Sequence, residues 1–225
     1  MTNLSELWDY FKFITSKEEI AGDERRILES FLKKEHTLWE SRRIQNLLKR
    51  SGIKRIKQIE DFDWTFNPKI PKDKIMKFIN SSWIQDAANL TLIGSSGTGK
   101  THIAKGICYK AILKGYSTVY ITCHDLVSKL DKAKNVYNLI DYYSNVKVFC
   151  LDEVGYVFPP QERTNQLFQI ISKRSELSST LITTNLIPSD WGKIFDSATA
   201  SAILDRLSLN GTFITFEGRS YRSEK

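Results

Sequence analysis

The stretch from Gly94 to Thr101 constrains this 225-residue chain more than any other part of its sequence. It reads Gly-Ser-Ser-Gly-Thr-Gly-Lys-Thr and matches the pattern G-x-x-x-x-G-K-[ST] at every fixed position. Glycines at these positions let backbone N–H groups turn toward phosphate oxygens, and a helix that begins near Lys100 directs the positive end of its dipole at the same anion. The pattern therefore predicts a phosphate-binding loop between a strand and a helix.

Two side chains of this loop carry further chemistry. Lys100 supplies a mobile positive charge for the outer phosphates of a nucleotide, and the hydroxyl of Thr101 is suited to bind the Mg²⁺ that bridges them. The competing interpretation is a glycine-rich turn without a ligand, and for His102 it is an ordinary position in the first helical turn. The candidate nucleotide contacts are Gly94, Ser95, Ser96, Gly97, Thr98, Gly99, Lys100, Thr101 and His102.

The sequence around the loop alternates between strand-like and helix-like segments. We expect strands at 90–93, 117–122, 146–151, 179–184 and 212–216, helices at 100–113, 164–175, 188–195 and 198–207, and helical segments from about 124 to 143. Strands that are separated by helices are typical of a parallel sheet covered on both faces. The predicted fold class is therefore α/β, with a parallel sheet flanked by helices.

Two carboxylates end the strand predicted at 146–151. Asp152 and Glu153 follow the apolar run Val-Phe-Cys-Leu, and the carboxyl ends of parallel strands open onto the ligand crevice. Asp152 is then a candidate ligand of Mg²⁺, and Glu153 a candidate base for the water that attacks the γ-phosphate. An Asp-Glu pair taken alone also fits the start of a solvated loop. A small-molecule kinase needs no base of this kind, whereas an NTP hydrolase does.

Two later polar positions are less specific. Asn185, or Thr184 before it, ends a strand where it can hydrogen-bond the γ-phosphate or the attacking water, but Asn is also a common turn residue. Arg206 falls late in a helical stretch, where it either pairs with Asp205 or reaches the nucleotide of a neighbouring subunit. Spacing alone leaves both alternatives open.

Positive charge is concentrated before the predicted sheet. The chain carries 33 Lys and Arg against 26 Asp and Glu, a net charge of +7, and eleven of these bases face six acids between Asp23 and Glu60. Residues 1–58 read as helical, with Phe31 and Trp39 expected in the core. A stiff cationic helix neutralises backbone phosphates of DNA, so this segment predicts contact with DNA or with a protein partner, against the alternative of an ordinary solvated face.

Membrane and secreted classes are not expected. No apolar run approaches the roughly 18 residues of a membrane span, and the first residues lack the basic and then apolar pattern of a signal peptide. Cys108, Cys123 and Cys150 are widely spaced, which disfavours a disulfide framework or a zinc site. We expect a cytoplasmic protein.

Several segments together resemble the IstB-like family, the ATP-binding helpers of insertion-sequence transposition, which are related to DnaC helicase loaders within the AAA+ superfamily. The Walker motifs are shared with many ATPases, whereas the Trp-Gly-x-x-Phe and Ser-Tyr-Arg segments are particular to the family. The segments that carry the resemblance are 60–63 (Glu-Asp-Phe-Asp), 97–102, 151–156 (Leu-Asp-Glu-Val-Gly-Tyr), 184–186, 189–195, 204–207 and 218–222.

The resemblance implies an AAA+ ATPase that assembles with copies of itself on double-stranded DNA and helps a transposase to choose and join a target. It assigns Lys100 and Thr101 to ATP and Mg²⁺, and Asp152 to Mg²⁺. It further assigns Glu153 to water activation, Asn185 to the sensor 1 position, and Arg206 to an arginine finger that acts on the neighbouring subunit.

This sequence departs from the family pattern at several positions. Ser95 and Ser96 replace a common Pro-Pro pair, and Arg219 stands where an acidic residue is usual. We expect a basic helical domain at 1–58 and an AAA+ ATPase domain at 59–225 without a full helical lid, because few residues follow Phe216. Arg222 is then the candidate for the sensor 2 position.

Three other functions are compatible with parts of the sequence. A DnaC-like replicative helicase loader shares every ATPase residue, so the motifs do not separate it from a transposition helper. A phosphotransferase acting on a small hydroxyl substrate is disfavoured by the adjacent Asp152 and Glu153 and by the basic segment. A DNA-binding module with a vestigial nucleotide site is the third alternative.

Overall fold

The computed structural model describes residues 4–13, 16, 19–20, 22–80 and 82–222. The chain forms two compact units, residues 1–46 and residues 47–225. Within the described ranges, no helix is long and apolar enough to cross a membrane.

The second unit is built on a five-stranded parallel sheet with the order β2-β3-β4-β1-β5. Each predicted strand is confirmed, with its ends shifted by at most three residues. The strands are β1 (Asn89–Gly94), β2 (Thr118–Thr122), β3 (Val148–Val154), β4 (Ser179–Thr184) and β5 (Gly211–Phe216). Their carboxyl ends lie at one edge of the sheet, where the predicted loop and carboxylates are found.

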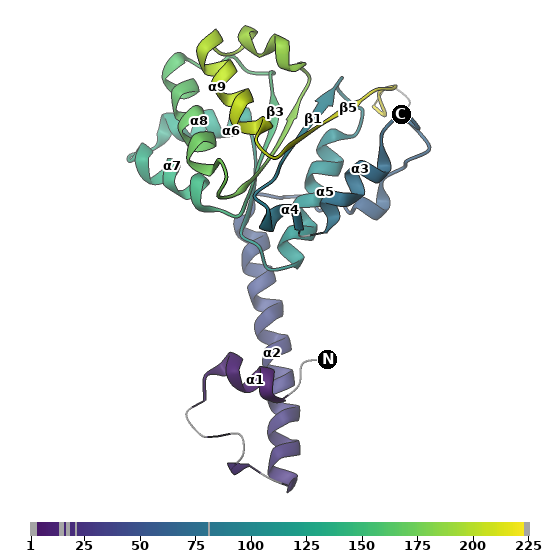
Figure 1. Ribbon diagram of the computed structural model, residues 1–225, viewed down its shortest axis with the longest axis vertical. Coiled ribbons are helices and arrows are strands. Elements are labelled where there is room, and N and C mark those ends of the chain that lie inside the picture. Colours follow the sequence, from purple (N-terminus) through teal and green to yellow (C-terminus); the bar gives the residue numbers. More distant parts are fainter. Residues whose placement is uncertain (1–3, 14–15, 17–18, 21, 81, 223–225) are drawn as a thin grey trace. The chain divides into compact units, whose positions relative to one another are not determined.

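Helices cover both faces of this sheet, as Figure 1 shows, with α3, α4 and α5 on one side and α6 to α9 on the other. This confirms the predicted fold class and explains why β1 and β4 are buried along nearly their whole length. The helices are α3 (Lys72–Met76), α4 (Ser82–Gln85), α5 (Lys100–Leu113), α6 (Cys123–Lys132), α7 (Val136–Asn145), α8 (Gln161–Arg174) and α9 (Ser197–Ser208), with short 3₁₀ turns η2 (Ile59–Asp61), η3 (Lys77–Ile79) and η4 (Pro188–Lys193).

The buried side chain of Arg174 connects the amino ends of the central strands β3 and β4 through hydrogen bonds. Arg174, at the end of α8, is 1% exposed. Its guanidinium donates to the carbonyl oxygens of Tyr143 at 2.8 Å and Val146 at 2.7 Å, and to the Thr180 hydroxyl at 3.1 Å. It also donates to the carbonyl of Ser179. One side chain thus joins α7, α8 and the starts of β3 and β4.

The first unit contains α1 (Leu4–Phe11) and most of α2 (Gly22–Arg50), a single 29-residue helix. Leu7, Trp8 and Leu32 form its small buried core. The expectation that Phe31 and Trp39 are core residues is wrong, because their exposed fractions are 56% and 45%. A helix with basic side chains around most of its circumference has too narrow an apolar stripe to bury every large residue.

The boundary between the two compact units lies between Asn46 and Leu47, before the expected domain boundary between residues 58 and 59. Residues after α2 belong to the second unit because they pair with the edge strand β2. The amide of Tyr120 donates to the carbonyl of Ser51 at 2.7 Å, and Ser51 is fully buried. Residues 1–3, 14–15, 17–18 and 21 of the expected N-terminal domain, and residues 81 and 223–225 of the expected ATPase domain, lie outside the described residues.

Candidate nucleotide-binding site

The loop from Gly94 to Thr101 joins the end of β1 to the start of α5. Gly97 and Gly99 have φ angles of +80° and +101°, a region that residues with a side chain rarely adopt. A Cβ on Gly97 would lie 2.0 Å from the Ser220 hydroxyl, and one on Gly99 would lie 2.5 Å from the Phe62 ring. Both glycines are thus required by backbone conformation and by close neighbours.

Lys100 folds back along the loop in this structure. Its Nζ donates to the carbonyl oxygens of Gly94 at 2.6 Å and Ser95 at 2.7 Å. Burial lowers the pKa of Lys100, the nearby Asp152 carboxylate raises it in part, and the Arg222 guanidinium lowers it further. The ammonium is therefore held by two carbonyl oxygens of the loop.

Asp152 is the most enclosed carboxylate of the site, with 1% of its surface exposed. The Thr101 hydroxyl lies 3.1 Å from both of its oxygens, and the hydroxyls of Tyr120 and Thr183 also donate to it. Burial and the Asp152 charge raise the pKa of Tyr120, so its phenol keeps the proton that it donates. Thr101 and Asp152, the two residues that the sequence suggests for Mg²⁺, thus lie in contact.

This set of oxygen ligands fits Mg²⁺. A buried carboxylate beside a loop hydroxyl supplies the hard oxygen atoms that Mg²⁺ prefers, and the low accessibility of Asp152 leaves its charge largely unhydrated. Thr101 and Asp152 are the residues that would hold the ion. When bound, Mg²⁺ supplies positive charge to the outer phosphate oxygens.

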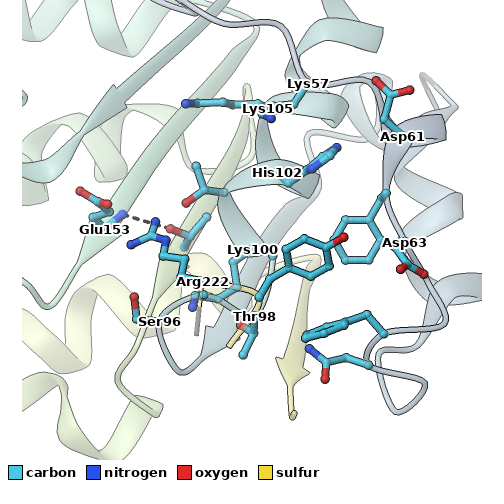
Figure 2. A pocket seen from close by; sticks show the side chains of 18 of the residues that line it. Lys57, Asp61, Asp63, Ser96, Thr98, Lys100, His102, Lys105, Glu153 and Arg222 are labelled. Carbon is cyan, nitrogen blue, oxygen red and sulfur yellow. Dashed lines mark hydrogen bonds between the residues drawn. The ribbon is translucent and has the colours of Figure 1, made fainter. Parts of the chain in front are cut away.

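Glu153, in contrast, is exposed and turned away from the strand. Its φ angle is +62°, and the pairing register between β3 and β4 shifts between Leu151 and Val154. Its amide donates to the Thr183 hydroxyl at 3.0 Å, drawn as the dashed line in Figure 2. The irregular backbone brings the Glu153 carboxylate to the cavity that the loop lines.

That cavity has a volume of about 510 Å³ and is formed by segments far apart in the sequence. Figure 2 shows Thr98 and Lys100 from the loop, His102 from α5, Glu153 from β3, and Arg222 from the end of the described chain. The remaining walls include aromatic rings. Phe66 and Tyr221 contact each other edge to face, with their ring centroids 4.5 Å apart. Charged groups and aromatic rings thus line the cavity together, and Asp63 lies on the same side as the rings.

The C-terminal segment closes one side of the cavity. Asn67 binds the backbone of Arg219 twice, donating to its carbonyl at 3.0 Å and accepting from its amide at 2.9 Å. The amide of Tyr221 donates to the carbonyl of Gly97 at 3.0 Å. The family-like segment 218–222 is therefore attached directly to the phosphate loop, and Arg222 lines the cavity.

Asn185, Thr184 and Arg206 do not line this cavity, whereas His102 does. Asn185 is exposed, and its Oδ1 is 2.6 Å from the point where a Cβ on Gly155 would be, while Thr184 is fully buried. Arg206 donates to the carbonyl of Ala202 at 3.0 Å and lies over the Phe168 ring. His102 contacts the carbonyl of Gln58 at 2.7 Å, which joins the helix to the entry segment.

The model of the IstB-like ATP binding protein family matches residues 4–225 of this chain. The chain belongs to this family. The IstB-like match covers both compact units, so the basic helix and the nucleotide site are parts of one family pattern.

Relatives of this IstB-like chain are encoded by insertion sequences. It is 35% identical over 187 residues to an IS232 protein of Bacillus thuringiensis described as ATP-binding, covering 81% of this chain and 75% of the relative. It is 33% identical over 223 residues to a similarly described IS5376 protein of Geobacillus stearothermophilus, covering 97% of this chain and 88% of the relative.

Solved structures of similar fold include the AAA+ proteins DnaI and DnaA. A crystal structure of DnaI has a TM-score of 0.61 and 20% identity, and covers 72% of this chain and 89% of that one. AMPPCP-bound DnaA from Aquifex aeolicus has a TM-score of 0.63 and 17% identity, and the match covers 74% of this chain and 52% of that one. At these identities the likeness establishes the AAA+ fold.

The sequence did not reveal two side chains that donate hydrogen bonds to Asp152. They are Tyr120 and Thr183. Both are read as ordinary strand residues because Tyr and Thr favour strands. The sequence did contain a signal, which is the spacing of polar residues near the strand ends. Thr183 is two residues before Asn185. Tyr120 is two residues before Thr122, which pairs with Asp152 in the sheet. Polar groups at alternate positions near the carboxyl ends of neighbouring parallel strands share one face and one edge.

Proposed function

We propose that this IstB-like protein is an AAA+ ATPase that assembles with copies of itself on double-stranded DNA and assists the transposase of the same element. The observation that carries the ATPase part is the 3.1 Å contact between the Thr101 hydroxyl and the buried Asp152, at the base of a phosphate loop. A glycine-rich turn without a ligand needs no buried carboxylate at this place, because burying a charge is costly.

Binding of ATP uses the loop and the groups around it. The backbone amides of residues 94–101 and the amino end of α5 face the phosphates, and Lys100 exchanges its two loop carbonyls for phosphate oxygens. Thr101 and Asp152 hold Mg²⁺. The aromatic rings of the cavity wall, with Phe66 and Tyr221 among them, offer apolar surface to the base and sugar.

Hydrolysis uses Glu153 as the general base. Its carboxylate is exposed on the cavity, as a group that must meet water has to be, and it accepts a proton from the water that attacks the γ-phosphate. Asn185 acts as the sensor 1 residue beyond the end of β4. A base of this kind favours hydrolysis over transfer to a small hydroxyl substrate.

Self-assembly completes the site through Arg206. Its side chain is 32% exposed, with the Asp205 carboxylate 3.9 Å away, and it lies outside the cavity of its own subunit. A cation that is accessible on α9 is suited to reach the γ-phosphate bound by a neighbour, where an arginine finger stabilises transition-state charge. ATP bound between subunits then favours the assembly, and hydrolysis releases it.

The partners are inferred from charge and from the relatives. The relatives belong to insertion sequences, elements whose movement requires a transposase, and helix α2 carries exposed basic residues along its length. We assign the helix to contact with DNA phosphates or with the transposase. Transposition acts on cellular DNA, and we place the protein in the cytoplasm.

A helicase loader is the second candidate, and the fold similarity to DnaI and to the DnaC helicase loader favours it. The DnaC structure has a TM-score of 0.56 and 21% identity, and covers 76% of this chain and 99% of that one. Capture of the replicative helicase rather than a transposase by the purified protein would support the loader.

The experiment that tests the proposed function measures nucleotide binding, its product and the assembly. We expect the wild-type protein to bind ATP with Mg²⁺, to release inorganic phosphate, and to form a larger species with duplex DNA and a non-hydrolysable ATP analogue. Lys100→Ala should weaken ATP binding about 100-fold, since a charge-assisted hydrogen-bond donor is lost. Lys110→Ala, on the same helix and paired with Glu60 outside the cavity, is the matched control. A phosphorylated metabolite as product, or no ATP binding by the folded protein, would contradict the proposal.

A further inference from the structure

Tyr120 is the one aromatic side chain whose hydroxyl donates to Asp152 among the described residues. It lies on β2, in register with Cys150, while Asp152 pairs with Thr122. Because side chains two apart on a strand share a face, Tyr120 and Asp152 are diagonal neighbours on the face covered by α5. The phenol reaches the carboxylate across the gap between two neighbouring strands.

The amide, the ring and the carbonyl oxygen of Tyr120 also have close neighbours. Its amide donates to the carbonyl of Ser51 at 2.7 Å, and the Nζ of Lys105 lies 4.7 Å from the centre of its ring. A Cβ on Gly52 would lie 2.5 Å from the Tyr120 carbonyl oxygen, so the chain leaving α2 packs directly on its backbone. Tyr120 itself is 9% exposed. The hydroxyl is therefore fixed in place before any ligand binds.

We propose that Tyr120 is a positioning residue that holds the Asp152 carboxylate in the orientation needed to bind Mg²⁺ beside Thr101. This inference rests on the proposed ATP and Mg²⁺ site. A carboxylate on a strand end rotates about its terminal bond unless its oxygens are held, and hydrogen bonds to the ligating groups of metal sites fix that rotation. Tyr120 and Thr183 donate from opposite neighbouring strands, β2 and β4, and clamp Asp152 between them.

The test measures Mg²⁺ dependence without requiring hydrolysis. A fluorescent, non-hydrolysable ATP analogue is titrated into wild-type protein and Tyr120→Phe over a range of Mg²⁺ concentrations and in EDTA. We expect Tyr120→Phe to raise the Mg²⁺ concentration needed for half-maximal tightening about 10-fold or more, since loss of such a supporting hydrogen bond weakens metal binding by this order. Affinity in EDTA should stay at the wild-type value, because the loop is unchanged.

Tyr143→Phe is the matched control. Tyr143 is 1% exposed, and its hydroxyl contacts Lys129 at 3.5 Å on the opposite face of the sheet. Removing this buried hydroxyl should leave the Mg²⁺ requirement unchanged. A merely structural role for Tyr120 would make the two variants alike, with lowered thermal stability and a wild-type Mg²⁺ requirement.

A second variant keeps the inference testable if Tyr120→Phe does not fold. Gly52→Ala places a methyl group against the Tyr120 carbonyl and displaces the strand without altering the phenol, whereas Gly192→Ala has no neighbour within 4 Å and serves as its control. We expect Gly52→Ala alone to raise the Mg²⁺ requirement. A folded Tyr120→Phe or Gly52→Ala protein with the wild-type requirement overturns the inference. Wild-type protein that fails to bind the analogue with Mg²⁺ overturns the proposed function instead.

Discussion

Asp152 and Glu153 are adjacent in the sequence, and the fold gives them opposite environments. Asp152 is 1% exposed and surrounded by hydroxyl donors, while Glu153 is exposed with a φ angle of +62°. The register shift between β3 and β4 causes this difference, since it releases Glu153 from the alternation of the strand. One carboxylate is thereby suited to hold a cation and the other to meet water.

The first prediction concerns Glu153. Glu153→Gln should leave ATP affinity near the wild-type value and lower the hydrolysis rate by at least about 100-fold, because general-base catalysis contributes 10² or more and the amide accepts no proton. Phosphate release under single-turnover conditions and a separate nucleotide-binding titration measure the two effects. Glu162→Gln, an exposed carboxylate on α8 paired with Arg163, is the control. Wild-type turnover by Glu153→Gln would show that another group is the base.

At the scale of elements, the sequence was sufficient to predict the strands and the phosphate loop. It was not sufficient to predict which side chains of neighbouring strands contact one another. Short apolar runs bounded by helices predict β1 to β5, and the glycines predict the loop. The clamp of Tyr120 and Thr183 on Asp152 was missed because it depends on which strands become neighbours, over separations of about 30 residues. Local pattern carries no information on that order, which places β4 between β3 and β1.

The same limit applies to the wall formed by the entry and C-terminal segments. Asn67 and Arg219 are 152 residues apart, and their pairing follows from the sheet order that places β5 beside β1. Phe31 and Trp39 were misplaced for another reason, because periodicity shows that residues share a helix face but not whether a partner covers it. Their exposure is a property of packing rather than of sequence.

The second prediction concerns Arg174, the side chain that joins α8 to the starts of β3 and β4. Arg174→Met should lower the free energy of unfolding by about 3 kcal/mol, because several buried carbonyl oxygens lose their donor at once. Denaturant unfolding followed by circular dichroism measures the loss. Lys173→Met, which removes an exposed ion pair with Asp141, should change it by less than about 1 kcal/mol. Equal effects of the two changes would contradict the assigned role of Arg174.

At the scale of the whole molecule, the chain combines a nucleotide site with a long basic helix in two compact units. The nucleotide site lies entirely in the second unit, since every residue that lines its cavity follows Leu47. The basic side chains of α2 lie mainly in the first unit and are exposed. The proposed ATP contacts and the proposed DNA contacts thus belong to different groups of residues and can be altered separately.

The third prediction uses that separation. Lys34→Gln combined with Arg42→Gln should weaken duplex DNA binding and lower the slope of log affinity against log salt by up to about 2, because each phosphate contact contributes roughly 0.9 to that slope. ATP affinity should not change. Lys173→Gln combined with Lys193→Gln removes the same charge from exposed positions of the second unit and is the control. An unchanged salt slope in the α2 variant would exclude these two bases from DNA contact.

The fourth prediction tests whether Arg206 acts between subunits. Arg206→Ala should bind ATP normally and lose hydrolysis about 10³-fold, as removal of an arginine finger does. Mixing it with Lys100→Ala should restore part of the activity, because an intact nucleotide site of the first variant then faces the intact Arg206 of the second. Lys100→Ala mixed with Glu153→Gln should remain inactive, since both defects lie in the same site and no interface is complete. If Arg206 instead only pairs with Asp205 and packs on Phe168, the first mixture gains nothing over its components.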